Sequence, residues 1–148
     1  MSSIRATNVS HVFGSGPTQV QVLRRLSIEV RPGELTLIIG PSGSGKSTLL
    51  SILSGLLRPT EGQVTVLGED LWNLSPAAID RFRLLHCGFV FQGFNLFSSL
   101  TAIEQVMLPL EYTGITSAEA ARRARRALEE VGLADTVAAC RACLRCSR

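Results

Sequence analysis

Polar and apolar residues alternate along three stretches in the first half of the chain, and this period of two predicts β-strands. The stretches cover residues 4–13, 20–30 and 62–67. In the second stretch, a charged residue separates Ile28 from Val30. Strands that alternate in this way are typical of antiparallel sheets with one face on a core. We therefore expect the three stretches to form an antiparallel layer.

Two shorter runs are apolar without alternation, and they predict strands of a different kind. They cover residues 35–39 and 87–91. Continuous apolar runs of this length are typical of strands that are buried on both faces of a parallel sheet. Pro32 and Gly33 come before the first run and predict a tight turn that leads into it.

Four later stretches carry apolar residues at the spacing of a helix. The first begins near Lys46 and extends its apolar face to Leu57. The second begins at Ser75, an N-cap residue that is followed by Pro76, and is expected to run to about Leu85.

The last two helices each begin with a predicted capping box, in which a threonine is followed three residues later by a glutamate. The two threonines are Thr101 and Thr116. Pro109 is expected to kink or end the first of these helices. The second is expected to turn four apolar residues inward: Ala121, Ala124, Leu128 and Val131.

The order of these elements predicts an α/β fold. Strands and helices alternate from residue 35 onward, which favours a parallel core sheet. The antiparallel stretches at residues 4–30 and 62–67 would form a separate layer beside that sheet.

Composition and charge narrow the class of protein. The chain has 148 residues, of which 45% are hydrophobic and 18% are charged, so it suits one domain with its own core. The net charge of +3 is too small to indicate nucleic acid as a partner. The arginines within residues 122–126 are expected to face solvent, because no aromatic residues interleave with them for base stacking.

No segment of the sequence predicts insertion into a membrane. No apolar run approaches the length of about 18 residues that spans a bilayer, and no signal-peptide core follows Met1. We therefore expect a cytoplasmic location, with any membrane contact made through a partner.

Three of the four cysteines lie close together, at Cys140, Cys143 and Cys146. Their spacing resembles the start of an iron–sulfur run, but no fourth ligand follows, and Cys87 is remote in the sequence. The spacing alone therefore indicates no complete metal site, and a cytoplasmic chain does not favour a disulfide framework.

The strongest chemical signal is the pattern G-x-x-x-x-G-K-[ST], which residues 40–47 match. The pattern lies between a predicted strand and a predicted helix, as a phosphate-binding loop requires. Its glycines let successive N–H groups point into one concavity, to which the helix N-terminus adds its positive dipole. Lys46 would bind the β- and γ-phosphates and Ser47 would bind Mg²⁺. The candidate binding residues are Gly40, Pro41, Ser42, Gly43, Ser44, Gly45, Lys46, Ser47 and Thr48.

This loop alone leaves several functions open. A Gly/Ser-rich turn that binds nothing would match the pattern, and kinases, GTPases and transport ATPases all carry such a loop. Four stretches narrow the choice: residues 20–34, 40–62, 88–96 and 100–106. In order and spacing they resemble the nucleotide-binding domain of an ATP-binding-cassette (ABC) transporter. The resemblance covers residues 4–139 and is greatest to the exporter group that includes the lipoprotein-release, macrolide-export and heterocyst-glycolipid ATPases.

The resemblance implies a P-loop NTPase fold of the ABC ATPase type and an ATP-binding subunit of an exporter, with ATP and Mg²⁺ as cofactors. Phe13 occupies the position at which the family stacks an aromatic ring on adenine, although an ordinary apolar strand end is the alternative. Gln92 occupies the Q-loop position, where its amide would reach Mg²⁺ and the attacking water. Residues 92–110 would face the membrane permease subunit, and a second ATPase subunit would complete the site.

The resemblance ends after residues 131–135. The Leu-Ser-Gly-Gly-Gln signature, a Walker B strand with its Asp and Glu, and a switch His do not follow. We expect residues 1–139 to be the amino-terminal part of an ABC ATP-binding domain, and residues 140–148 to be an atypical Cys/Arg-rich tail that arises from a frameshift or truncation. Such a chain would bind ATP·Mg²⁺ weakly or need a partner to fold, and would show little or no turnover by itself.

Three functions follow from these patterns. The first is a truncated ATP-binding subunit of an exporter, peripheral at the inner face of the cell membrane when assembled. The second is a non-catalytic nucleotide-binding module that docks on a transporter, or a non-functional fragment. The third is an unrelated P-loop kinase or GTPase, which would need an acceptor site or switch motifs that the sequence does not show. The sequence does not indicate the transported substrate, because the membrane subunits usually determine substrate specificity.

Overall fold

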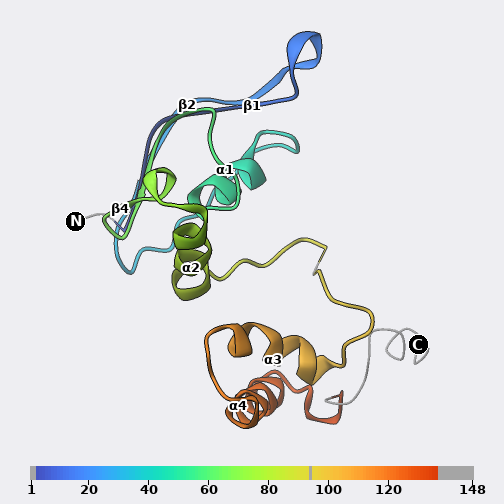
Figure 1. The fold of residues 1–148 in the computed structure, drawn as a ribbon. Coiled ribbons are helices and arrows are strands. Elements are labelled where there is room, and N and C mark those ends of the chain that lie inside the picture. Colours follow the sequence, from blue (N-terminus) through green and yellow to red (C-terminus); the bar gives the residue numbers. More distant parts are fainter. Residues whose placement is uncertain (1–2, 94, 137–148) are drawn as a thin grey trace. The chain divides into compact units, whose positions relative to one another are not determined.

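The computed structural model describes residues 3–93 and 95–136. The chain divides into two compact units, Met1–Cys87 and Gly88–Arg148, each of which is described by itself (Figure 1).

The amino-terminal unit is built on a four-stranded antiparallel sheet (Figure 1). The order of strands across the sheet is β2-β1-β3-β4, so that β1 pairs with both β2 and β3. A 3-10 turn, Gly16–Thr18, connects the first two strands. The alternating stretches of the sequence are thus confirmed as an antiparallel layer. The strands are β1 (Ile4–Phe13), β2 (Val20–Val30), β3 (Glu61–Val66) and β4 (Glu69–Asp70).

Helices cover this sheet. The first, α1 (Lys46–Leu53), contacts β2 and β3. It ends at Leu53 rather than at the predicted Leu57, because Gly55 has a φ of +76°, at which a helix cannot continue. After a 3-10 turn, η2 (Leu71–Asn73), the helix α2 (Pro76–His86) begins where the sequence predicts. Ser75 is its N-cap, since the Ser75 hydroxyl accepts a hydrogen bond from the Ala78 N–H at 3.3 Å.

The core of this unit is formed by the inward residues of the strands together with those of α1, η2 and α2. The largest fully buried side chains come from β1, β3, α1 and η2, and they are Val9, Val64, Ile52 and Leu71. Burial of these four apolar side chains is the main source of stability that holds α1, and the loop that precedes it, against the sheet.

The two continuous apolar runs do not form strands, and both strand predictions are wrong for the structure as described. Residues 35–39 form no ladder with any described segment. The side chains of Leu35, Leu37 and Ile39 are 97%, 79% and 84% exposed, while Ile38 packs against the core. Residues 87–91 are likewise not a strand. A strand requires a hydrogen-bonded neighbour, and the described residues supply none to either run, so the expected parallel sheet has no pairing here.

The carboxy-terminal unit contains a pair of helices that pack together (Figure 1). They are α3 (Ala102–Tyr112) and α4 (Ser117–Glu130), followed by a 3-10 turn, η3 (Ala134–Thr136). The buried residues of α4 are Ala120, Ala124 and Leu128. The predicted inward face is therefore wrong for Ala121, which is partly exposed, and for Val131, which is mostly exposed. Val131 lies beyond the end of the helix as its C-cap, so helical spacing no longer directs its side chain.

The caps of these two helices differ from each other. The capping box at Thr101 is confirmed: its hydroxyl accepts a hydrogen bond from the Glu104 N–H at 3.4 Å, and its N–H donates to the Glu104 carboxylate at 2.8 Å. Thr116 is an N-cap without a side-chain hydrogen bond, and the Glu119 carboxylate that would complete the box is held by Arg122 and Arg123. The predicted box at Thr116 is therefore wrong.

Pro109 does not end α3, which continues to Tyr112. A proline removes the single hydrogen bond that its own nitrogen would donate. In α3 that loss falls within the last two turns, where few bonds remain to be disturbed.

No helix within residues 3–93 and 95–136 is long and apolar enough to cross a membrane. Cys140, Cys143 and Cys146, with the predicted boundary at residue 139, lie outside the described residues. Cys87 is a free, half-buried thiol whose pKa is raised by burial, an effect that the charge of Arg83 opposes.

Candidate nucleotide-binding site

The predicted phosphate loop forms a compact turn directly before α1. Gly43 and Gly45 have φ angles of +78° and +89°, in the left-handed region that glycine adopts without strain. Between them, the Ser44 N–H donates a hydrogen bond to the Pro41 carbonyl at 3.3 Å, which closes the turn. Gly45 is the N-cap of α1, so the loop leads straight into the helix as the sequence predicts.

Gly45 also places the loop against the sheet. A Cβ atom added to Gly45 would lie 2.8 Å from Leu23 Cδ2 and 3.0 Å from the carbonyl oxygen of Val22. Both neighbours belong to β2. The backbone of the loop therefore lies so close to β2 that only glycine fits at position 45. The sequence motif alone does not show this packing requirement.

The side chain of Lys46 folds over the loop. Its ammonium group donates hydrogen bonds to the carbonyl oxygens of Gly40 at 2.8 Å and Pro41 at 2.7 Å, and lies 3.4 Å from the Ser44 hydroxyl. Lys46 is the only lysine in the sequence. The cationic side chain is thus held over the loop by neutral carbonyl acceptors, and the charged oxygens of a phosphate group would be stronger acceptors in their place.

The first turn of α1 provides further groups that suit an anion. The first intrahelical hydrogen bond runs from the Leu49 N–H to the Gly45 carbonyl at 2.8 Å. The N–H groups of residues 46–48 therefore have no acceptor within the helix. The first turn contains no acidic residue that would oppose an anion. Ser47 is exposed, and no described residue hydrogen-bonds its hydroxyl. Backbone donors, one ammonium group and a hydroxyl are a set that fits a magnesium polyphosphate.

Phe13 lies on the same strand pair that the loop contacts. It is the last residue of β1, it is 45% exposed, and it pairs across the ladder with Val20 of β2. Gly45 meets β2 at Val22, which is two residues, or about 7 Å, along the strand from Val20. Phe13 and the phosphate loop are therefore both placed by the first residues of β2, within one unit.

Gln92 belongs to the other unit, where its side chain is exposed. The part of the chain described here offers it no hydrogen bond. Its predicted contacts with Mg²⁺ and water therefore remain a prediction that rests on its position in the sequence.

Gln105 is a structural residue that sequence analysis missed. Its amide oxygen accepts a hydrogen bond from the Phe97 N–H at 3.2 Å, and its amide nitrogen donates to the carbonyl oxygens of Phe97 and, at 3.4 Å, Leu100. One side chain thus ties the segment before α3 to the helix itself. A glutamine in the first turns of a helix carries no pattern that would have marked this role.

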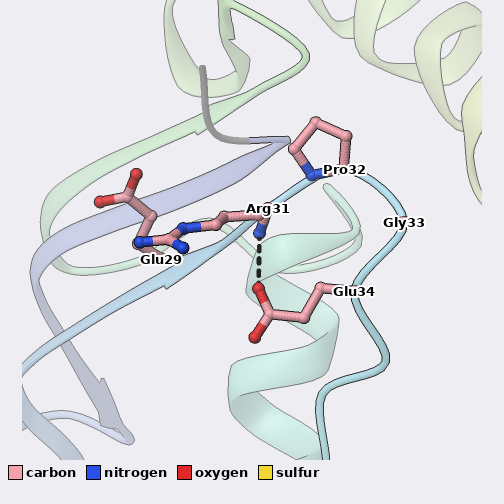
Figure 2. Close-up of a pocket in the computed structure, with 5 residues that line it drawn as sticks. All are labelled: Glu29, Arg31, Pro32, Gly33 and Glu34. Carbon is pink, nitrogen blue, oxygen red and sulfur yellow. Dashed lines mark hydrogen bonds between the residues drawn. The ribbon is translucent and has the colours of Figure 1, made fainter.

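A separate hollow of about 570 Å³ lies at the turn before residue 35 (Figure 2). It is lined by Glu29, Arg31, Pro32, Gly33 and Glu34. Figure 2 shows the hydrogen bond of 2.9 Å that the Arg31 N–H donates to the Glu34 carboxylate. With two carboxylates and one guanidinium, this hollow does not suit a polyphosphate, and none of the predicted binding residues lines it.

Comparison with known proteins gives consistent matches. A family described as ABC transporter matches residues 23–143. An uncharacterised ABC transporter ATP-binding protein of Thermotoga maritima is 47% identical over 128 residues, which are 86% of this chain and 55% of that protein. The lipoprotein-releasing system ATP-binding protein LolD of Geobacter metallireducens is 44% identical, over 90% of this chain and 59% of its own length. The chain thus spans a little over half the length of these two relatives.

Two further matches extend the comparison. The macrolide export ATP-binding/permease protein MacB of Salmonella typhimurium is 45% identical, over 88% of this chain and 20% of its own length. Among solved structures, the ATP-binding cassette MJ0796, described as a dimer in a post-hydrolysis state bound to ADP and Pi, superposes with a TM-score of 0.84. It is 35% identical, and the match covers 91% of this chain and 60% of that one.

Proposed function

This chain belongs to the ABC transporter family and has the fold of its ATPase cassettes, and from this premise we propose that it binds ATP with Mg²⁺ to drive export across a membrane. The observation that carries the proposal is the position of Lys46. Its ammonium group lies over the concave side of the loop, next to the positive end of α1. That arrangement is suited to the β- and γ-phosphates of a nucleotide.

Each part of the site has one task in this proposal. The backbone N–H groups of residues 42–48 and the Lys46 ammonium bind the phosphates, with Thr48 as a further contact. Ser47 holds Mg²⁺, and Gln92 is assigned to the same ion on the family resemblance alone. When bound, the ion neutralises phosphate charge and orients the terminal phosphate. Phe13 is assigned to the adenine ring, since its own ring is partly exposed at the end of β1.

The transport role and the partners rest on the relatives. Relatives named for lipoprotein release and macrolide export support an exporter, and one of them combines ATP-binding and permease parts in a single protein. We assign residues 92–110 to the contact with a membrane permease subunit. A second ATPase subunit would complete the site, in keeping with the dimeric state named for the solved relative.

Substitution of Lys46 tests nucleotide binding. Lys46→Ala removes a charged donor, and charge-assisted hydrogen bonds of this kind correspond to a loss of about 10- to 100-fold in affinity for ATP·Mg²⁺. Affinity is measured by calorimetry on the 148-residue chain, with and without Mg²⁺. Arg81→Ala, which removes one exposed positive charge from α2, is the matched control and should bind as the wild type does. Equal affinity of Lys46→Ala and wild type would contradict the proposal.

The single lysine offers a second readout of the same site. An amine-directed reagent has only two targets in the chain, Lys46 and the α-amino group. ATP·Mg²⁺ should protect the first and leave the second unchanged, which peptide mass spectrometry distinguishes. Labelling of Lys46 that saturating ATP does not slow would argue against a phosphate at the loop.

A further inference from the structure

His11 occupies a position in β1 that an apolar residue would be expected to fill. It is only 7% exposed, and its Nδ1 atom is buried without a hydrogen-bond partner in the part of the chain that the structure describes. Buried polar atoms are normally hydrogen-bonded, because an unmet one loses its hydration without compensation. An aliphatic side chain would avoid that loss, so core packing alone does not favour an imidazole at this position.

The imidazole lies against Phe13. The two ring centroids are 4.5 Å apart and the ring planes cross at 78°, which is the T-shaped arrangement that aromatic pairs prefer. Phe13 is the last residue of its strand and its side chain is partly exposed, so the ring is not enclosed by the core. We propose that His11 is a positioning residue that holds the Phe13 ring in the orientation that stacks on adenine.

The backbone of His11 is itself fixed with respect to the phosphate loop. His11 pairs across the ladder with Leu23 of β2, and Leu23 is the residue whose side chain closely approaches Gly45. The base-stacking ring and the phosphate loop are therefore both placed by the same short segment of β2. This inference rests on the proposed function, since it takes Phe13 as the adenine contact.

Two probes separate the base from the phosphates. ATP·Mg²⁺ reports both contacts, whereas inorganic triphosphate with Mg²⁺ reports the loop alone. The dissociation constant for triphosphate divided by that for ATP measures the contribution of the nucleoside, and this quotient is called the ratio below. His11→Leu fills the buried volume without an aromatic edge or a bare nitrogen, and should fold at least as stably as the wild type. Its affinity for ATP should fall about three- to tenfold, the range measured for aromatic pairs, with triphosphate binding unchanged.

Two further variants make the readout specific. His11→Phe restores an aromatic edge and should recover the wild-type ratio. Val9→Ala, at a fully buried position of the same strand, should lower the melting temperature without changing the ratio. A purely structural role for His11 would instead move stability and leave the ratio fixed.

The outcomes distinguish this inference from the proposed function. If Phe13→Ala lowers the ratio but His11→Leu does not, the role of His11 is overturned and the adenine contact stands. If Phe13→Ala leaves the ratio unchanged, or the wild type binds neither probe, the adenine contact fails and the role of His11 fails with it. Should His11→Leu not fold, His11→Phe decides, because a ratio as low as that of Phe13→Ala overturns the inference.

Discussion

At the scale of single residues, the phosphate loop depends on Gly45 for two separate reasons. Its φ of +89° is costly for any residue with a Cβ atom, and its contact with β2 leaves no room for one. Gly43 shares only the first reason: its φ is +78°, but a Cβ atom there would meet nothing within 4 Å. The two glycines of one motif are therefore required to different degrees.

This difference predicts unequal effects of the same substitution. Gly43→Ala should cost about 1 kcal/mol of unfolding free energy from backbone strain alone. Gly45→Ala should cost about 3 kcal/mol, because strain is joined by overpacking against Leu23 and Val22. Urea unfolding of both variants measures the difference. Equal losses would show that the contact of the loop with β2 does not persist in solution.

At the scale of elements, the helices α3 and α4 begin with the same sequence pattern and are capped differently. Thr101 and Glu104 satisfy each other, and the pKa of Glu104 is lowered, first by the Thr101 N–H and then by its hydroxyl. The pKa of Glu119 is lowered by Arg123 and Arg122 instead, and the Thr116 side chain forms no cap. The arginines of α4, absent from α3, decide between the two arrangements.

The contrast predicts a pH-dependent difference between two threonine substitutions. Thr101→Ala should cost α3 about 1 kcal/mol at neutral pH, the usual value of an N-cap, and Thr116→Ala should cost α4 much less. Because the folded-state pKa of Glu104 is below its ordinary value of 4.5, its contribution is complete above pH 4.5 and is lost as the pH falls through the lowered pKa. The cost of Thr101→Ala should therefore shrink in acid.

Hydrogen exchange of the α3 and α4 amides at several pH values tests this expectation. Glu111→Gln, which changes an α3 carboxylate that forms no ion pair with any described residue, serves as the control. Because Ala keeps the backbone N–H at this position, a cost of Thr101→Ala that stays constant through the acid range would show that the Thr101 hydroxyl forms no bond with the Glu104 carboxylate.

At the scale of the molecule, the described residues of the amino-terminal unit form an antiparallel layer, and none of them pairs in a parallel one. Its core is closed around Val9, Ile52 and Val64, yet the apolar run at residues 35–39 remains largely exposed. An exposed extended segment with apolar side chains and unbonded backbone groups is a site of association. The 148-residue chain by itself is therefore expected to self-associate through this run.

Charged substitutions in the run test that expectation. The double variant Leu35→Lys, Leu37→Lys should reduce concentration-dependent association without altering the circular dichroism, because both side chains are exposed. Leu49→Lys, at a buried position of α1, should instead unfold the unit. Sedimentation velocity over a range of concentrations measures association. Unchanged association of the double variant would place the contact elsewhere.

Local features of this chain were determined by the sequence alone. The antiparallel strands are predictable because polar and apolar residues alternate along parts of β1, β2 and β3, and because β1 and β2 are joined by a short turn. The starts of α2 and α3 are predictable because Ser75 and Thr101 form their caps with neighbours three residues away. The phosphate loop at residues 40–48 is also predictable, because its chemistry lies in contiguous residues. These local patterns are the ones on which the family resemblance rests.

Features that depend on distant partners were decided only by the tertiary structure. The apolar run at residues 35–39 reads as a strand, but a strand exists only where another segment bonds to it. The contact of Gly45 with Val22 is one of packing between two elements, and no spacing in the sequence encodes it. Hydrophobic pattern and turn chemistry act within a few residues, whereas packing depends on which surfaces meet, and that is why the loop was predicted and its support on β2 was not.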